Sequence, residues 1–398
     1  RHIVKKITDI DMKEMNVLIR VDFNVPIVEN KVADSYRIEK AKKTIQYCLD
    51  QGACVILMSH LGRPKNIVDK KYSLEPILFV LEEMFDNDIY FSDDCISSNA
   101  INFSNELIPG EIHLLENLRF YRQEKNNDVE FARSLSEHAD IFINDAFGVC
   151  HREHASNSAI LNFFDHNTSG FGFLINSEIS YLKKILVKPP KPFTLILGGA
   201  KIDDKILMIE NMLHNTDNIL IGGKMAFSFL KAKGENVGGA NVDKENITIA
   251  KNIIGKAKQK SVKIYLPKDF VCVEKDSNEE VWSIKKLVNL CKYDLGYDIG
   301  PETSLLFDQV IVSSKCILWN GPMGRFELHQ FATGTDSVAN SVGKIKGRNA
   351  LTVVGGGDTA SAVNSKDLKQ SFNHISTGGG ASLMILSGKK NKIIKEIL

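Results

Sequence analysis

Two glycine runs near the C-terminus carry residue types that suit phosphate binding. Residues 355–359 read Gly-Gly-Gly-Asp-Thr, and residues 376–380 read Ser-Thr-Gly-Gly-Gly. Each run follows a short apolar stretch, so we expect each at the end of a strand and the start of a helix. Glycine lets backbone N–H groups approach an anion, and a helix N-terminus attracts negative charge. With Asp358 available as a magnesium ligand, the pattern indicates a phosphorylated ligand such as a nucleotide.

Other glycine- and lysine-rich segments follow predicted strands of the C-terminal half. They are residues 198–205 (GGAKIDDK), 222–224 (GGK) and 320–324 (NGPMG). One such strand end is often only a tight turn. Several in one half of the chain favour a nucleotide whose phosphates lie against the backbone, with Lys201 and Lys205 as mobile charges.

Arginines take the corresponding places in the N-terminal half. Four of them follow predicted strand ends or open a helix: Arg37, Arg63, Arg119 and Arg152. The guanidinium group binds phosphate and carboxylate in bidentate fashion. Any one of these arginines, taken alone, would more often form a surface ion pair. Four in equivalent positions, with Asp22, Asn24 and His60 beside them, favour a small polyanionic substrate.

A polyanion in one half and a nucleotide in the other indicate phosphoryl transfer across a cleft that closes to exclude water. No GxxxxGK[ST] segment occurs, which excludes a P-loop kinase. Residues 355–360 also fit GxGxxA, a dinucleotide-binding pattern. That interpretation needs an acidic residue about 20 positions later, and residues 374–377 (His-Ile-Ser-Thr) contain none. An oxidoreductase is therefore disfavoured.

The elements that would position these residues alternate between strand and helix. Apolar, β-branched runs alternate with segments of helical period such as Ile38, Ala41, Ile45 and Leu49. This alternation predicts an α/β fold with parallel sheets, in which ligands bind beyond the carboxyl ends of the strands. The predicted strands are 17–23, 54–59, 111–115, 141–144, 193–197, 219–221, 262–266, 316–319 and 351–354.

A length of 398 residues favours two domains. Residues 177–186 have one apolar face and read as a helix, which the proline-rich segment 188–192 would stop. We therefore expect a first domain over about residues 1–175, a connecting helix over 176–190 and a second domain from 191.

Composition excludes several classes of partner. A net charge of +1 gives no general attraction to nucleic acid or to a membrane surface, so any anion site must be local. No run of about 18 apolar residues suggests a membrane span, and residues 1–6 lack the apolar region of a signal peptide. The seven cysteines are scattered without a CxxC pair, which indicates reduced thiols rather than a zinc site or a disulfide framework. These features predict a cytoplasmic protein.

Beyond these patterns, the sequence resembles the phosphoglycerate kinase family from end to end. Eight stretches carry the resemblance, in the family's order and at family-like intervals. They are residues 20–26 (RVDFNVP), 59–64 (SHLGRP), 115–120 (LENLRF), 144–148 (NDAFG), 197–201 (LGGAK), 319–322 (WNGP), 355–360 (GGGDTA) and 376–382 (STGGGAS).

The resemblance implies two Rossmann-like lobes with parallel sheets, joined by a connecting helix and a hinge. It implies 3-phosphoglycerate in the N-terminal lobe, which residues from about 375 to 398 would complete. It implies Mg²⁺ with ADP or ATP in the lobe over about 191–374. The implied reaction is 1,3-bisphosphoglycerate + ADP to 3-phosphoglycerate + ATP, in glycolysis. No association segment is evident, so we expect a monomer, and the charge and composition lead us to expect no nucleic-acid or membrane partner.

Matched by position, the implied substrate site comprises Asp22, Asn24, Arg37, His60, Arg63, Arg119 and Arg152. The implied nucleotide site comprises Gly199, Ala200, Lys201, Lys205, Gly222, Gly296, Asn320, Pro322, Glu327, Gly356, Gly357, Asp358 and Thr359, with Asp358 as the magnesium ligand. The implied catalytic groups are Arg37, Lys201, Gly378 and Gly379.

The chain departs from the family pattern near its end. The family commonly has Glu where this chain has Met384 and Ser387, and continues Gly-Lys with Leu-Pro-Gly where residues 388–392 read GKKNK. These departures leave the implied site intact but touch the C-terminal segment. A homologue with weakened catalysis, kept for binding, stays as the alternative; loss of Lys201, Arg37 or Asp358 would have signalled it, and all three are present.

Overall fold

The computed structural model describes residues 5–398, apart from the side chain at position 365. Within it the chain divides into two compact units: unit 1 runs up to Ser180 and takes in Lys390–Leu398, and unit 2 is Tyr181–Lys389. Contacts alone do not define folding domains, so the predicted limits near 175, 190 and 374 stay predictions. The prediction about a signal peptide falls partly on residues 1–4, outside the described residues.

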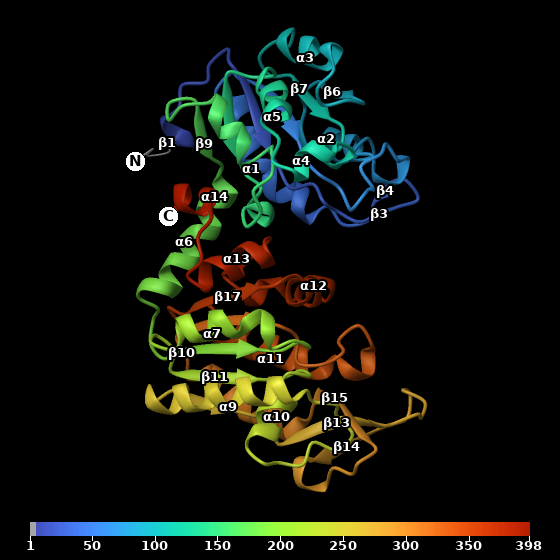
Figure 1. The fold of residues 1–398 in the computed structure, drawn as a ribbon, viewed down its shortest axis with the longest axis vertical. Coiled ribbons are helices and arrows are strands. Elements are labelled where there is room, and N and C mark those ends of the chain that lie inside the picture. The colour runs from blue at the N-terminus through green and yellow to red at the C-terminus, as the bar shows by residue number, and fades with distance from the viewer. Residues whose placement is uncertain (1–4) are drawn as a thin grey trace. The chain divides into compact units, whose positions relative to one another are not determined.

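Unit 1 is built on a seven-stranded sheet in the order β1-β9-β8-β2-β5-β7-β6, in which every neighbouring pair is parallel (Figure 1). Its central strands consist of buried residues because both faces of a parallel sheet are covered. The strands are β1 (Lys5–Lys6), β2 (Asn16–Arg20), β5 (Cys54–Met58), β6 (Ile89–Ser92), β7 (Ile112–Leu115), β8 (Ile141–Asn144) and β9 (Ser169–Phe171), besides the antiparallel pair β3 (Ile27–Val28) and β4 (Lys31–Val32).

The helices of unit 1 bury one face each. On α1 the predicted apolar face of Ile38, Ala41, Ile45 and Leu49 is buried, which confirms that helix. The helices are α1 (Tyr36–Asp50), α2 (Ile77–Met84), α3 (Ser98–Asn105), α4 (Arg122–Lys125), α5 (Val129–Ser136) and α14 (Lys392–Ile397).

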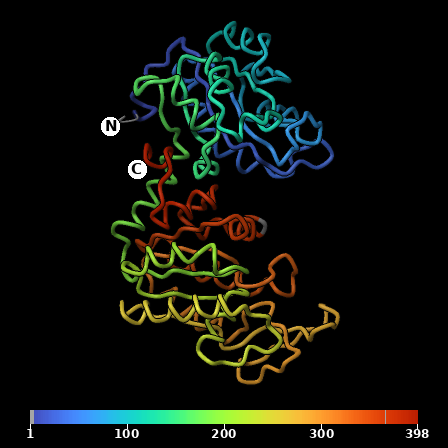
Figure 2. The backbone as a smooth tube through the Cα atoms, viewed as in Figure 1, coloured from blue at the N-terminus to red at the C-terminus, as the bar shows by residue number. Residues whose placement is uncertain are grey.

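The last helix, α14, returns to unit 1 and is the red end of the tube in Figure 2. Asn391 caps it by accepting a hydrogen bond from the Ile394 N–H at 2.8 Å, and its amide donates to the Cys150 carbonyl at 2.7 Å. Ile393 and Ile394 are fully buried, while Lys395 is exposed. Helix α14 therefore buries its isoleucines and exposes Lys392 and Lys395, as an amphipathic helix does.

Unit 2 contains a six-stranded parallel sheet in the order β12-β11-β10-β16-β17-β18. Together with the parallel sheet of unit 1, this confirms the predicted α/β class. The strands are β10 (Phe193–Leu197), β11 (Asn218–Ile221), β12 (Lys263–Tyr265), β16 (Cys316–Asn320), β17 (Leu351–Gly355) and β18 (His374–Ile375), and the helices are α7 (Ile206–Met212), α8 (Ala226–Ala232), α9 (Lys244–Gln259), α10 (Pro301–Val312), α11 (Thr333–Ile345), α12 (Gly357–Ser365) and α13 (Gly379–Leu386).

Unit 2 also contains an antiparallel sheet that the sequence analysis missed. It consists of β14 (Trp282–Lys286), β13 (Asp269–Glu274) and β15 (Asp294–Ile299) in that order. Strand β14 is largely exposed and β15 contains Asp294, Gly296 and Asp298. Such composition lacks the apolar run that marks a buried strand.

The chain passes from unit 1 to unit 2 within α6 (Phe173–Val187), which begins four residues before the predicted start at 177. The reason is a cap from a distant residue. Asp145, directly after β8, accepts hydrogen bonds from the backbone N–H groups of Leu174 at 3.0 Å and Ile175 at 3.3 Å. No helix in residues 5–398 has both the length and the apolar content to cross a membrane.

Candidate active site

Three predicted residues of unit 1 are joined by hydrogen bonds beyond the carboxyl ends of β2 and β5. Asp22 accepts from Arg37 Nη1 at 3.0 Å and from the Asn24 N–H at 3.1 Å. Asn24 Oδ1 in turn accepts from the Gly62 N–H at 2.8 Å. The carboxylate and the amide are therefore held in place by the backbone and by Arg37, whose side chain is 36% exposed.

Positive charge is crowded beside this group. Arg119 is 5% exposed and donates through Nη1 to the Gly62 carbonyl at 2.7 Å. Burial, together with Arg20 and Arg152, lowers the pKa of Arg119 to about 10. Burial lowers the pKa of Lys125 as well, followed by repulsion from Arg119, Arg152 and Arg63. Mutual repulsion of this kind marks a place where an anion would relieve the crowding.

Three buried nitrogens in this region have no partner among the described residues: Arg119 Nε, His151 Nδ1 and His154 Nδ1. Buried polar atoms are normally hydrogen-bonded, so unpaired nitrogens beside a cluster of cations fit a ligand site. Burial, then the nearby arginines, lower the pKa of His154 to about 4. Neither His154 nor Lys125 lies in one of the motifs read from the sequence, so both enter the site only from the structure.

His60 is 3% exposed and lies against a second buried cation, Arg20. Arg20 Nη2 is 3.1 Å from His60 Nδ1. In the sequence, Arg20 appears only as the first residue of the motif 20–26. Its place at the end of the otherwise apolar strand β2 could have indicated a buried charge. Arg63 and Arg152 are both exposed. Their positive charges contribute to the lowered pKa of Lys125, so they belong to the same cluster of cations.

In unit 2 the strand ends are joined by backbone hydrogen bonds. The Gly198 N–H donates to the Asn320 carbonyl at 3.0 Å, and the Gly199 N–H to the Pro322 carbonyl at 2.9 Å. A Cβ at Gly198 would overlap the Pro322 carbonyl oxygen, and Gly321 has a φ of +103°. Gly198 is required because another backbone segment lies close to it, and Gly321 because its φ is positive. Such glycines are compatible both with a tight turn and with a phosphate-binding backbone.

The two glycine runs meet each other. A Cβ at Gly379 would lie 3.2 Å from Gly356 Cα and 3.2 Å from Gly357 N. Thr359 is 1% exposed, and its Oγ1 accepts from the Gly321 N–H at 2.6 Å, which joins the start of α12 to the end of β16. The Gly378 N–H is directed to Ser376 Oγ at 3.2 Å. Predicted residues of β16, α12 and α13 thus form one surface.

Beside this surface lies a cavity of about 520 Å³. Its apolar wall includes Phe227, Phe270, Leu295 and Met323. Of these, only Met323 lies in a segment that the sequence singles out (320–324), because an isolated apolar residue carries no signal of a binding cavity. Six predicted residues line it: Gly199, Ala200, Gly296, Pro322, Glu327 and Asp358. The other predicted nucleotide residues, Lys201, Lys205, Gly222, Asn320, Gly356, Gly357 and Thr359, are not among its lining.

The residues present fit a magnesium–nucleotide site. Asp358 is exposed at the first turn of α12, and its charge acts on the nearby Lys205, whose pKa burial lowers. No group of three or more His, Cys, Asp or Glu residues is placed to hold a metal within residues 5–398. A single carboxylate suits Mg²⁺, which keeps several waters and takes further oxygens from substrate phosphates. A Cβ at Gly199 would lie 3.7 Å from Lys205 Nζ, so this ammonium lies beside the backbone turn.

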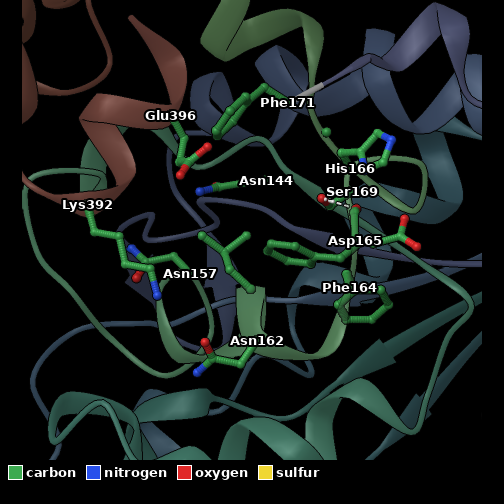
Figure 3. Close-up of a pocket in the computed structure, with 13 residues that line it drawn as sticks. Asn144, Asn157, Asn162, Phe164, Asp165, His166, Ser169, Phe171, Lys392 and Glu396 are labelled. Atoms are coloured by element: carbon green, nitrogen blue, oxygen red, sulfur yellow. Dashed lines mark hydrogen bonds between the residues drawn. The ribbon is translucent and has the colours of Figure 1, made fainter. Parts of the chain in front are cut away.

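A smaller cavity of about 140 Å³ lies elsewhere in unit 1, between β8, β9 and α14. Figure 3 shows that Lys392 and Glu396 of α14 face it from one side and Phe164 and Phe171 from the others. None of the predicted site residues lines it, so it is separate from the cation cluster.

Comparison with known proteins finds the same family that the sequence motifs resemble. The family model described as phosphoglycerate kinase matches residues 7–389. A phosphoglycerate kinase of Finegoldia magna is 47% identical over 390 residues, covering 97% of this chain and 96% of that protein. One of Chloroherpeton thalassium is 42% identical over 386 residues, covering 97% of each chain.

Solved structures of phosphoglycerate kinases have a fold similar to that of this chain. The phosphoglycerate kinase structure from Coxiella burnetii has a TM-score of 0.86 and 33% identity, covering 99% of this chain and 98% of that one. The structure from Pyrococcus horikoshii has a TM-score of 0.84 and 29% identity, covering 98% of each.

Proposed function

The chain belongs to the phosphoglycerate kinase family, and on this premise we propose how its residues divide the work of the reaction. It is a phosphotransferase with a carboxyl group as acceptor, and it catalyses the glycolytic step 1,3-bisphosphoglycerate + ADP ⇌ 3-phosphoglycerate + ATP. The assignment of individual residues below is the proposal.

Unit 1 binds phosphoglycerate in this proposal. The observation that carries it is the buried Arg119, whose Nε has no partner among the described residues and which lies among the cations Arg20, Arg152 and Lys125. His60, Arg63, Arg119 and Arg152 hold the phosphate that is not transferred. Asp22 and Asn24, held by Arg37 and the Gly62 N–H, orient the hydroxyl and carboxyl end.

Unit 2 binds the nucleotide. The cavity beside Phe227 and Gly296 takes the base, and Glu327 at its rim contacts the ribose. Gly222, Asn320, Pro322 and Thr359 hold the backbone around the phosphates. We assign Mg²⁺ to Asp358 and charge on the phosphates to Lys205; when bound, the metal supplies charge neutralisation to the phosphate oxygens.

The chemistry needs positioning more than proton transfer. The acceptor is a carboxylate, already ionised at neutral pH with an ordinary pKa of about 4, so no general base is required. Arg37 and Lys201 carry positive charge to the group in transit. The N–H groups at Gly378 and Gly379 add donors at the start of α13, and the Gly378 N–H would exchange its bond to Ser376 Oγ for one to the transferring group. Charge stabilisation of an in-line transfer after closure of the two lobes is the main contribution of these residues.

The direct test measures ADP formation from Mg-ATP with and without 3-phosphoglycerate, and again with EDTA. We expect turnover only when both 3-phosphoglycerate and the metal are present. If there is no turnover although both substrates bind, the chain is a non-catalytic homologue. If there is turnover in EDTA, the magnesium assignment to Asp358 fails.

We also propose a cytoplasmic monomer with no nucleic-acid or membrane partner, as suits a glycolytic kinase of net charge +1. Sedimentation velocity of the purified protein, with and without both substrates, measures the oligomeric state. A concentration-dependent dimer would contradict this part of the proposal.

A further inference from the structure

We propose that Arg20 is a positioning residue that fixes the imidazole of His60 as the Nε2–H tautomer, so that His60 meets the bound anion as a neutral hydrogen-bond donor. The proposal rests on the placement of phosphoglycerate in unit 1 for the anion, but the tautomer itself does not depend on it. Arg20 acts through His60 and is not assigned a contact with substrate.

The direction of the hydrogen bond decides the tautomer. Arg20 Nη2 lies 3.1 Å from His60 Nδ1. A guanidinium group has only donors, so Nδ1 must present its lone pair. The proton of a neutral imidazole is then on Nε2, the nitrogen that is free to donate to a ligand.

The guanidinium is itself held in one orientation. Arg20 is fully buried, and its Nε donates to Ser156 Oγ at 2.9 Å while Nη1 donates to the Val21 carbonyl at 2.6 Å. Its remaining nitrogen, Nη2, is thereby aimed at His60. An arginine with its donors fixed in this way cannot turn to let Nδ1 become a donor.

A buried carboxylate completes the arrangement. Glu124 is fully buried and accepts from Ser156 Oγ at 2.7 Å and from the Ser156 N–H at 2.8 Å. Because the serine hydroxyl donates to Glu124, its oxygen is left to accept from Arg20. Glu124 Oε2 is 3.9 Å from Arg20 Nη2, so the buried positive charge has a counter-charge. The donor of each hydrogen bond between Glu124 and His60 is therefore determined: Ser156 donates to Glu124, and Arg20 donates to Ser156 and to His60.

The surroundings of His60 favour its neutral form. The charged and titratable groups that act on it are Arg20, Arg119, Arg37 and His154, and none of them carries negative charge. Burial first, and then these groups, hold the pKa of His60 well below its ordinary value of 6.5. At neutral pH the arginines supply the charge that attracts an anion, and His60 supplies one directed N–H.

The first experiment observes the tautomer without any substrate. Nitrogen-15 NMR of the imidazole groups distinguishes the two tautomers and the imidazolium. The His60 signals are assigned as those missing from the spectrum of His60→Gln. We expect a neutral Nε2–H imidazole that does not change from pH 6 to pH 8. An Nδ1–H tautomer, or an imidazolium in that range, would overturn the proposal.

The role of Arg20 is tested in the double variant Arg20→Met/Glu124→Gln, which leaves no buried carboxylate without a partner. We expect His60 to show a mixture of both tautomers, with a raised KM for 3-phosphoglycerate and an unchanged KM for Mg-ATP. A pure Nε2–H tautomer in this folded variant would show that Arg20 is not what fixes the imidazole. Thermal unfolding of the variant confirms that it is folded; if it is not, Arg20→Lys, which shortens the donor, replaces it.

The donor role is tested by two substitutions of matched chemistry. An amide at the end of Gln can reach the place of Nε2, whereas the shorter Asn reaches only the place of Nδ1. We expect His60→Gln to keep the KM for 3-phosphoglycerate within a few-fold, and His60→Asn to raise it about tenfold, the cost of one hydrogen bond to a charged group. If both variants bind as the wild type does while NMR shows the Nε2–H tautomer, the phosphoglycerate placement fails and the tautomer assignment stands.

Discussion

The anion sites proposed for unit 1 and unit 2 are built from different groups, side chains in unit 1 and backbone in unit 2. In unit 1, side chains are positioned by hydrogen bonds to other side chains. Glu124 and Ser156 orient Arg20, and Arg20 orients His60. In unit 2, backbone holds backbone, as where the Gly199 N–H meets the Pro322 carbonyl. The lysines proposed to act there, Lys201 and Lys205, are an exposed and a half-buried side chain. We infer that a phosphate that stays in place suits fixed charges, and a group in transit suits mobile ones.

Both units nevertheless contain a buried carboxylate that caps a helix. Asp145 accepts from the first turn of α6, and Asp298 accepts from the Gly334 N–H of α11 at 2.8 Å. Burial raises the pKa of each to about 7. The difference between the units therefore lies in the groups proposed to contact the ligands and not in how these two helices are capped.

The largest expected effect is that of Lys201→Ala. A mobile ammonium that acts only as charge develops should cost about 10²–10³ in kcat when removed, as loss of a single transition-state donor does. The KM values for both substrates should stay within a few-fold. Steady-state ADP formation measures this, and Lys233→Ala, at an exposed lysine after α8, is the control. A large rise in KM at unchanged kcat would assign Lys201 to ground-state binding instead.

Arg63→Ala should separate the two units through KM. Its side chain is exposed, so thermal stability should not change, but the KM for 3-phosphoglycerate should rise about tenfold or more, because a charge-assisted hydrogen bond is lost. The KM for Mg-ATP should be unaffected. Arg348→Ala, at an exposed arginine of unit 2, is the matched control. Equal loss for both substrates would break the assignment of one substrate to each unit.

Thr359→Val tests whether backbone geometry in unit 2 depends on one hydroxyl. The Gly321 N–H would lose its acceptor at 2.6 Å and stay buried, which costs about 1–3 kcal/mol of unfolding free energy. The KM for Mg-ATP should rise and that for 3-phosphoglycerate should not. Thr359→Ser keeps the oxygen and should behave as wild type in urea unfolding. If Val and Ser behave alike, the hydroxyl is not what holds this surface.

Asp145→Asn should change how stability depends on pH. The folded pKa of about 7 lies above the ordinary value of 3.8, so between these values unfolding releases a proton. The wild-type free energy of unfolding therefore falls as pH rises through this window, by up to ~1.4 kcal/mol per pH unit from this group. The amide that replaces the carboxyl group has no such proton, so the variant should gain stability relative to wild type from pH 5 to pH 7 in urea unfolding.

Two matched variants sharpen that measurement. Asp298→Asn should show the same trend in unit 2, because its carboxyl group is buried in the same way. Asp165→Asn should show none in this window, since hydrogen bonds from its neighbours lower the pKa of that exposed carboxyl group. Parallel curves for Asp145→Asn and wild type would mean that Asp145 is ionised in the folded state at pH 5.

Much of the fold could be predicted because its signals are local. Buried strands such as β10 read as apolar runs, and the face of α1 reads at helical period. The antiparallel sheet containing β14 and β15 could not, since β14 is largely exposed and β15 is interrupted by Asp294, Gly296 and Asp298, so neither strand shows an apolar run. The early start of α6 was missed because its cap, Asp145, lies 29 positions before Leu174.

For the site, the sequence by itself determined which residue types follow each strand: arginines in unit 1, glycines and lysines in unit 2. Strand ends are local features, so they and the family motifs they carry can be read along the chain. Only the tertiary structure decided which charges are buried and what they contact. Arg20 and Ser156 lie 136 positions apart yet share a hydrogen bond, and Phe227 and Phe270 meet as a stacked pair at one cavity wall. Contacts of this kind depend on how the sheet brings distant strand ends together, and no local pattern encodes them.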